Sequence, residues 1–181
     1  MAILPLIRFP HPCLEQVAAP VDATAAATGQ LAHDLLETMH AAPGIGITAC
    51  HVGIMQRLVV IDLPTDGHGP RIYANPEIIW NSAETATREE GSVSMPGIHA
   101  PVTRPERVRV RYTRPDGAQA EEEAEGLLAL CLQHEIDQIN GIFWIRRLSR
   151  LRRDRALKRY AKLERDHAMA GGQSTFPSSS I

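Results

Sequence analysis

The spacing of apolar residues predicts two amphipathic helices. The first is expected over residues 22–40, where apolar side chains recur at helical intervals at Leu31, Leu35, Leu36 and Met39. Asp22 is the expected N-cap, and the Pro43-Gly44 pair ends this pattern. The second helix is expected over residues 127–140 and is closed by Gly141.

Four other stretches have the composition of strands. Residues 58–63 (LVVIDL) are rich in branched apolar side chains and predict a buried strand, followed by a turn at 64–70 and a short strand at 71–74. Residues 108–112 alternate apolar and charged side chains, as a half-exposed strand does. A Pro-Asp-Gly turn at 115–117 should return residues 118–124 as the partner strand. Residues 5–20 contain four prolines and should be extended.

The second helix has a stripe that begins apolar and becomes polar midway. Its expected inward face is Leu127, Cys131, His134 and Gln138, with Leu130 and Glu135 beside it. Burying polar groups without partners costs about 1–3 kcal/mol each, so this face is predicted to border a site. Cys131, on the apolar part of the stripe, is assigned to the core.

Length and composition favour one globular domain. The chain has 181 residues, of which 44% are hydrophobic and 22% charged. Its longest apolar run is interrupted at Asp62, so no membrane span is expected, and the N-terminus lacks the pattern of a secretory signal. Three widely spaced cysteines argue against a disulfide framework. These features together predict a cytoplasmic protein.

Charge is distributed unevenly along the chain. Residues 146–165 carry ten Lys and Arg against two acidic residues, a net charge of +8, and the remaining residues have a net charge of −10. We expect this basic segment to form a third helix over residues 149–167, which either binds phosphate groups or only solvates its exposed face.

Three short segments contain candidate chemistry, although each is weak alone. Residues 44–53 (GIGITACHVG) place glycines where another backbone can approach. Residues 88–97 (REEGSVSMPG), taken alone, predict a loop with a solvated acidic pair. Residues 133–142 (QHEIDQINGI) place His134 and Gln138 on one helix face beside Glu135. A His-Glu-x-x-His helix binds a catalytic metal, but here Gln138 occupies the second histidine position.

In this order, the three segments resemble those of the peptide deformylase family, and the resemblance extends over residues 6–167. It implies a mixed α+β fold in which small antiparallel sheets surround a central helix, followed by a C-terminal helix. We accordingly expect one domain over residues 1–168 and a flexible tail over 169–181. Family members remove the formyl group from the N-terminal methionine of nascent chains, using a divalent metal held by one Cys and two His.

The resemblance assigns roles to individual residues of this chain. The three metal-ligand positions are Ser92, His134 and Gln138, so only the histidine is retained. Glu135 occupies the general-base position, while His51 and the backbone N–H of Val93 occupy the oxyanion positions. Substrate contacts are expected along Gly44, Ile45, Gly46, Glu90 and Gly91. Because Ser and Gln are weak metal ligands, no cofactor is expected or, if any, one divalent ion such as Fe, Zn or Ni.

Several functions remain open from the sequence. The first hypothesis is a catalytically impaired family member that still binds peptide N-termini, formylated or not. A second is hydrolysis of an N-acyl peptide, either by a displaced metal on His51 and His134 or by Ser92 acting as a nucleophile. Alternatively, His51 only hydrogen-bonds to Ser92 or Gln138. A third hypothesis is ribosome or RNA docking through the basic helix. The sequence does not determine the oligomeric state.

Overall fold

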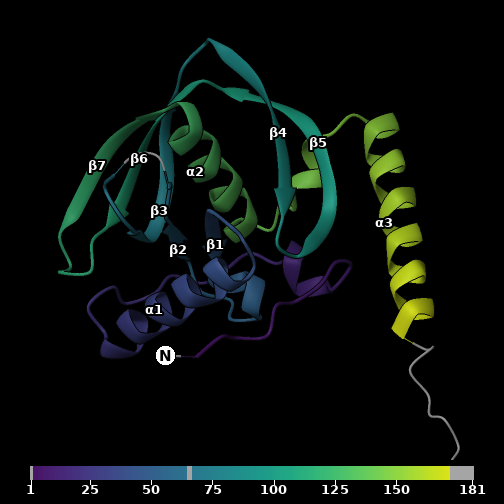
Figure 1. Ribbon diagram of the computed structural model, residues 1–181. Coiled ribbons are helices and arrows are strands. Elements are labelled where there is room, and N and C mark those ends of the chain that lie inside the picture. The colour runs from purple at the N-terminus through teal and green to yellow at the C-terminus, as the bar shows by residue number, and fades with distance from the viewer. Residues whose placement is uncertain (1, 65–66, 172–181) are drawn as a thin grey trace, which may run out of the picture.

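The computed structural model describes residues 2–64 and 67–171, and within them the strands form two antiparallel sheets (Figure 1). The five-stranded sheet has the order β1-β2-β3-β6-β7. Its strands are β1 (Gly46–Thr48), β2 (Leu58–Ile61), β3 (Arg71–Asn81), β6 (Arg107–Thr113) and β7 (Gln119–Glu125). The two-stranded sheet pairs β4 (Thr85–Ser92) with β5 (Met95–Pro105). The predicted strands are confirmed, although β3 is longer than residues 71–74. Positions 65–66 of the predicted turn lie outside the described residues.

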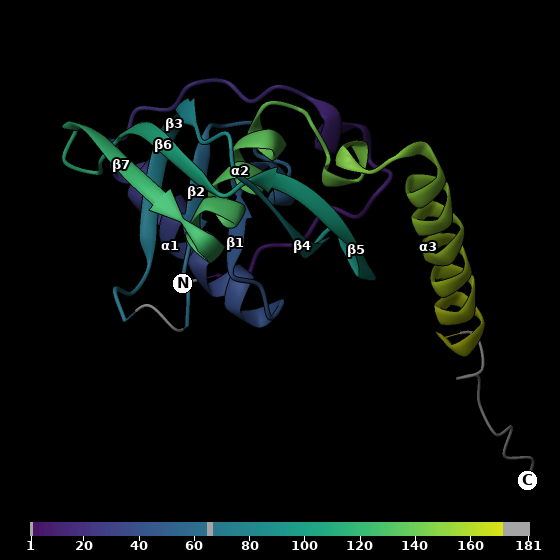
Figure 2. The ribbon, with the colours of Figure 1, turned by 90° about the horizontal axis from the view of Figure 1, so that it is seen from above.

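The described residues form three α-helices, one between the two sheets and two outside them. Helix α2 (Gly126–Ile139) lies between the five-stranded sheet and the β4–β5 hairpin, whereas α1 (Ala26–Ala41) packs against β1 and β2 (Figure 1). Helix α3 (Arg150–Gly171) packs outside β5 and stands apart from the rest of the fold (Figure 2). Short 3-10 helices are η1 (Pro12–Glu15), η2 (Ala49–Val52) and η3 (Trp144–Arg147). The architecture is therefore mixed α+β, with antiparallel sheets around a central helix, as predicted.

Strand β2 packs against α1 on one face of the sheet and against α2 on the other. Successive side chains of a strand point to opposite faces. Leu58 and Val60 belong to the apolar cluster that includes α1, and Val59 and Ile61 belong to the cluster that includes α2. All four are fully buried, which is why the sequence has an unbroken apolar run here.

Helix α1 begins later than the sequence predicts. Asp22 is not its N-cap, because the Asp22 carboxylate accepts hydrogen bonds from the backbone N–H and hydroxyl of Thr24, at 2.9 and 2.8 Å. The Asp22 carbonyl accepts a third bond from the Thr28 hydroxyl. These contacts stabilise a turn before the helix. The N-cap residue is Ala25, whose side chain makes no capping hydrogen bond.

The β4–β5 hairpin replaces the loop predicted for residues 88–97. Strand β4 is polar apart from Ala86 and Gly91, with Glu90 as its one buried residue, so it has no apolar alternation, and β5 contains three prolines. Proline is tolerated because each strand has only one neighbour and therefore keeps an open edge. The acidic pair is not solvated as a pair, since Glu90 is buried while Glu89 is exposed.

The structure differs from the sequence predictions at the start of α2 and at the end of α3. Leu127 was expected inside but is 38% exposed, because it lies in the first turn of α2, at the mouth of a cavity. Helix α3 extends to Gly171, beyond the predicted end at residue 167, and positions 172–181 of the predicted tail lie outside the described residues. Among the described helices, none combines the length and apolar character needed to cross a membrane.

Candidate functional site

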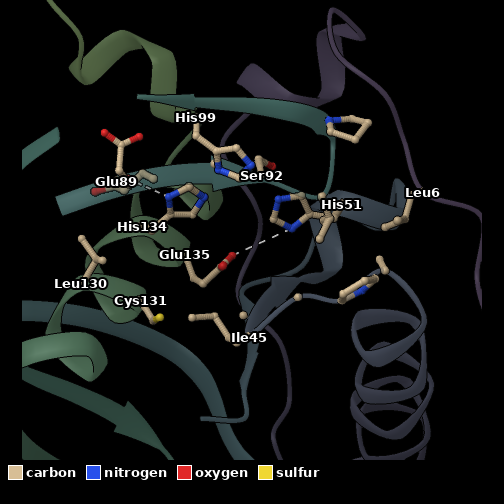
Figure 3. Close-up of a pocket in the computed structure, with 18 of the residues that line it drawn as sticks. Leu6, Ile45, His51, Glu89, Ser92, His99, Leu130, Cys131, His134 and Glu135 are labelled. Carbon is tan, nitrogen blue, oxygen red and sulfur yellow. Dashed lines mark hydrogen bonds and ion pairs between the residues drawn. The ribbon is translucent and has the colours of Figure 1, made fainter. Parts of the chain in front are cut away.

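A cavity of about 500 Å³ lies where β1, the β4–β5 turn and α2 meet (Figure 3). Its glycines come from β1, the segment before it and the hairpin, and its ionisable groups come from the hairpin, α2, the segment after β1 and the N-terminal segment. All but one of the predicted site residues line it: Gly44, Ile45, Gly46, His51, Glu90, Gly91, Ser92, Val93, His134 and Glu135. The tertiary structure therefore brings the three sequence segments together at one site.

Gln138 is the predicted site residue that does not line the cavity. Its side chain is buried, and its amide nitrogen donates a hydrogen bond to the Leu14 carbonyl at 2.8 Å. Gln138 thus ties α2 to the N-terminal segment. Ser92 does line the cavity, and its hydroxyl oxygen accepts a hydrogen bond from the backbone N–H of Ser94 at 3.2 Å.

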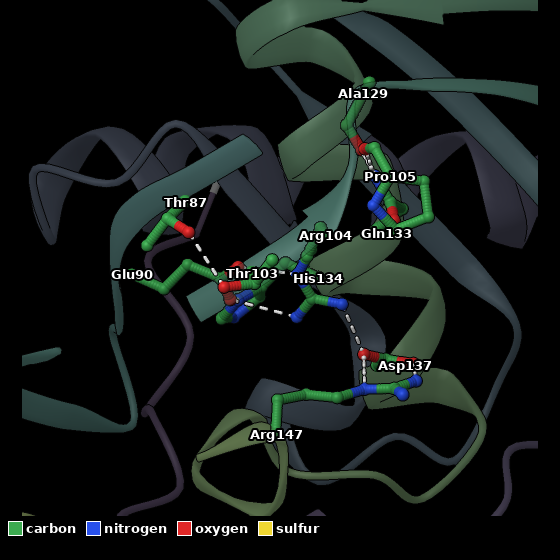
Figure 4. A network of polar contacts seen from close by, with 10 residues as sticks. All are labelled: Thr87, Glu90, Thr103, Arg104, Pro105, Ala129, Gln133, His134, Asp137 and Arg147. Carbon is green, nitrogen blue, oxygen red and sulfur yellow. Dashed lines mark hydrogen bonds and ion pairs between the residues drawn. The ribbon is translucent and has the colours of Figure 1, made fainter. Parts of the chain in front are cut away.

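His134 is oriented by a buried network of charges (Figure 4). Its Nδ1 lies 2.9 Å from Oε2 of Glu90. Arg104 donates to both Glu90 oxygens, at 2.5 and 2.9 Å, and to Asp137 at 2.7 Å. Arg147 also donates to Asp137. Each buried charge is therefore opposed by a partner of the other sign, as burial requires.

This network fixes the protons at His134. Burial alone would raise the pKa of Glu90, but hydrogen bonds from His134 and Arg104 lower it to about 2. Glu90 is therefore a carboxylate that can only accept, and the proton between the two residues resides on His134 Nδ1. Burial opposes a charge on His134, yet the Glu90 hydrogen bond raises its pKa overall. In the neutral ring, Nε2 is left as the acceptor.

Glu135 lies against the backbone of β1. A Cβ atom at Gly46 would be 2.6 Å from its Oε1, so the carboxyl group takes this position only because residue 46 is glycine. Burial, and secondarily the charge of Glu90, raise the pKa of Glu135 to about 7, although His134 opposes the shift. A carboxyl group of this pKa can take or release a proton near neutral pH, as a general base must.

The hypothesis that His51 hydrogen-bonds to Ser92 or Gln138 is wrong. Its Nδ1 instead accepts a hydrogen bond from the backbone N–H of Thr48 at 3.0 Å, and the Thr48 hydroxyl is equally close. Burial, and secondarily the charge of His134, lower the pKa of His51 to about 3, so the ring is neutral. The 3.9 Å approach of Nδ1 to Glu135 is consequently not an ion pair.

The donor set does not fit the three-ligand metal centre that the resemblance implies. Ser92 offers a neutral hydroxyl, and the Gln138 amide is bound to Leu14 outside the cavity. A displaced site on His51 is also unfavourable, because ligation through Nε2 needs the ring proton on Nδ1, where Thr48 donates. Within the described residues, no three His, Cys, Asp or Glu side chains are grouped to hold a metal ion.

The serine-nucleophile hypothesis lacks its key contact. A nucleophilic serine needs a base within hydrogen-bond distance of its hydroxyl. Among the described residues, neither His51 nor His134 hydrogen-bonds to the Ser92 hydroxyl. The arrangement of His134 and Glu90 resembles the base and its orienting acid, but it lacks the nucleophile.

Sequence reasoning missed several residues around the cavity. Arg104 was not identified, although its position on the same strand face as Ile98 and Val102 was a signal, because a buried arginine requires an acid. The prolines of β5 concealed that alternation. Arg8 and His99 line the cavity mouth, and Arg8 also donates to the Val93 carbonyl at 2.7 Å. Cys131, assigned to the core, is buried there and also borders the cavity.

Comparison with known proteins agrees with this fold. The family model for polypeptide deformylase matches residues 3–154. A protein of Rhizobium meliloti (strain 1021) named peptide deformylase-like is 58% identical, and the match covers 96% of this chain and 100% of that one. A peptide deformylase-like protein of Brucella melitensis biotype 1 is 53% identical over 91% of this chain and its own full length.

Solved structures give the same result. A crystal structure of a peptide deformylase from Legionella pneumophila matches with a TM-score of 0.85 and 36% identity, covering 92% of this chain and 98% of that one. The chain therefore belongs to the polypeptide deformylase family.

Proposed function

We propose that this chain is a family member that binds the N-terminal segment of a peptide but is impaired in metal-dependent deformylation. The observation that carries this proposal is the Gln138 side chain. At a family ligand position, it donates to the Leu14 carbonyl instead of facing the cavity. With Ser92 at a second position, His134 is left as the single strong ligand, and Glu135 has no activated water to deprotonate.

Peptide binding does not depend on the lost ligands. Strand β1 is an edge strand with β2 as its one neighbour, and residues 44–46 line the cavity. An extended peptide can add to such an edge through main-chain hydrogen bonds. Gly91 and Val93 border the opposite side, so the cavity can hold a peptide between β1 and the hairpin.

Restoring the ligands tests this proposal. The purified wild-type protein should hold well below one divalent ion (Fe, Zn or Ni) per chain and show no removal of formate from N-formylmethionyl peptides. The double variant Ser92→Cys with Gln138→His should gain metal, since thiolate and imidazole are strong ligands for these ions. Metal content is measured by mass spectrometry after anaerobic purification without an affinity tag.

Matched single variants complete this experiment. Ser92→Cys and Gln138→His supply one ligand each and should bind metal more weakly than the double variant. A wild-type protein that carries about one metal ion per chain and deformylates peptides would refute the proposed impairment. A wild-type protein that binds neither formylated nor free peptides would refute the proposed binding function.

A second candidate role concerns α3. Its apolar face packs on β5 and η3 through Ala156 and Tyr160, which leaves most of its basic side chains exposed. Two arginines of the basic segment are already paired within the chain, Arg146 with Glu15 and Arg147 with Asp137. The exposed basic residues that follow, from Arg150 to Arg165, support docking on ribosomal RNA, which we propose as a separate function.

A further inference from the structure

Within the described residues, strand β7 is the open edge of the five-stranded sheet, at the opposite end from β1 (Figure 1). It pairs with β6 along its full length without a bulge, and it contains no proline. An antiparallel strand uses alternate backbone N–H and C=O groups for one neighbour, so the remaining groups of β7 point to the free edge. Such a row of unpaired backbone groups can receive an added strand. No residue of β7 lines the cavity, so this edge is separate from the peptide site.

Glutamates give one face of this edge a negative charge. Glu121, Glu123 and Glu125 alternate along β7, so they share the sheet face turned away from α2, and all three are exposed. Arg111 donates two hydrogen bonds to one oxygen of Glu121, at 3.0 and 2.9 Å, and Arg109 donates to one oxygen of Glu123 at 3.2 Å. Among the described residues, each of these two carboxylates keeps a second oxygen without a hydrogen bond, and Glu125 has no ion pair. The three glutamates can therefore take further cations.

Strand β6 shows which kind of strand fits beside β7. Its sequence RVRVRYT alternates basic and apolar residues. Its three arginines lie directly opposite the three glutamates: Arg107 opposite Glu125, Arg109 opposite Glu123 and Arg111 opposite Glu121. Opposite charges on directly paired residues stabilise a sheet, whereas like charges destabilise it. A strand on the free edge of β7 meets the same glutamates, so it fits best when basic residues occupy its alternate positions.

A second copy of this chain does not provide such a strand. Pairing β7 with β7 would place glutamates beside glutamates, which is unfavourable. Strand β6 already has β3 and β7 as neighbours, and the basic segment from Arg150 onward is helical. We propose that the free edge of β7 docks an extended basic segment of another protein, which adds as an antiparallel strand with alternate Lys or Arg residues beside Glu121, Glu123 and Glu125. This docking surface is independent of the proposed function.

The test uses two acetylated and amidated peptides of the same composition, RVRVRYT and VRRVYRT. The first repeats the alternation of β6, and in the second no two arginines are two positions apart. Binding to the full chain is measured by calorimetry at low salt, and its location by hydrogen exchange. The alternating peptide should bind roughly tenfold more tightly than the rearranged one, because only its arginines match the spacing of the glutamates. It should also protect alternate amides of β7.

Two triple variants separate this edge from the overall charge of the protein. The first neutralises the glutamates of β7: Glu121→Gln, Glu123→Gln and Glu125→Gln. It should weaken binding of the alternating peptide roughly tenfold. The control removes the same charge from three exposed positions of α3: Asp154→Asn, Glu164→Gln and Asp166→Asn. It should leave the affinity unchanged, and thermal unfolding confirms that both variants are folded.

Several results would overturn the inference. Equal affinity for the two peptides would show attraction by charge without strand pairing. Unchanged affinity in the β7 variant, protection confined to residues outside β7, or no binding of either peptide would each reject the docking edge. Dimerisation of the wild type that protects β7 would assign the edge to a second copy and would also reject the proposed basic partner.

Discussion

At the scale of single residues, the site depends on which atoms each side chain can bring into the cavity. His134 and Glu135 are adjacent in sequence, but His134 is held by Glu90 whereas Glu135 lies on the backbone of Gly46. Gln138, one turn further along α2, is held outside by Leu14. The partner that each side chain contacts therefore decides whether the residue lines the cavity or only stabilises the fold.

Gly46→Ala tests how closely Glu135 depends on residue 46. The new Cβ would lie 2.6 Å from Glu135 Oε1, so the carboxyl group or the strand must move. We expect a loss of about 1–3 kcal/mol in the free energy of unfolding, measured by urea denaturation, together with weaker peptide binding.

Gly29→Ala is the matched control. No atom lies within 4 Å of its Cβ, and alanine in this helix should stabilise the protein by roughly 0.5–1 kcal/mol. Equal stability of the Gly46→Ala variant and the wild type would contradict the close contact.

At the scale of elements, Arg104 on β5 connects the hairpin to α2. It bridges Glu90 of β4 and Asp137 of α2, and it is 5% exposed. The same arginine determines the charge beside His134, because its hydrogen bonds help lower the pKa of Glu90. The hairpin, the helix and the protonation of the site are therefore coupled.

Arg104→Met should cost about 3–5 kcal/mol of stability at pH 7, since two buried carboxylates lose the arginine they share, leaving Glu90 with His134 and Asp137 with Arg147. Arg109→Met removes an exposed pair with Glu123 and should cost less than about 1 kcal/mol.

The wild type should lose stability as the pH falls from 4.5, the ordinary pKa of Glu90, toward its folded value of about 2. In Arg104→Met the pKa of Glu90 rises, so acid unfolding should begin at higher pH. Chemical denaturation at several pH values measures both effects, and similar losses in the two variants would argue against a buried network.

At the scale of the whole molecule, no described residue of α3 lines the cavity. The helix packs outside β5, on the side of the hairpin away from the five-stranded sheet (Figures 1 and 2). The basic surface of α3 is therefore distinct from the cavity. Docking through α3 and peptide binding in the cavity are consequently tested separately.

Docking through α3 predicts co-sedimentation with ribosomes at low salt and its loss at moderate salt, because contacts with phosphates release counterions. Reversing the charge of the exposed residues Lys158 and Arg165 to Glu should abolish co-sedimentation without changing peptide affinity. Reversing Arg109 and Arg111, on the exposed face of β6, is the control. A wild type that does not sediment with ribosomes even at low salt has no such docking function.

The sequence by itself determined the elements whose patterns are local. An apolar stripe predicted α2, a run of branched apolar residues predicted β2, and an alternating strand followed by a Pro-Asp-Gly turn predicted the β6–β7 pair. The three motifs predicted ten of the residues that line the cavity. The β4–β5 hairpin was not predictable from pattern, because an exposed strand and a proline-rich strand have no apolar alternation.

Only the tertiary structure decided the state of the site residues. That Gln138 faces Leu14, that Arg104 neutralises Glu90 and that Thr48 fixes the proton of His51 depend on hydrogen bonds, two of them between distant segments. A sequence pattern specifies which side chains are present on a face. The partner that each buried polar atom finds is decided when the segments pack together, because burial makes an unpaired polar atom costly.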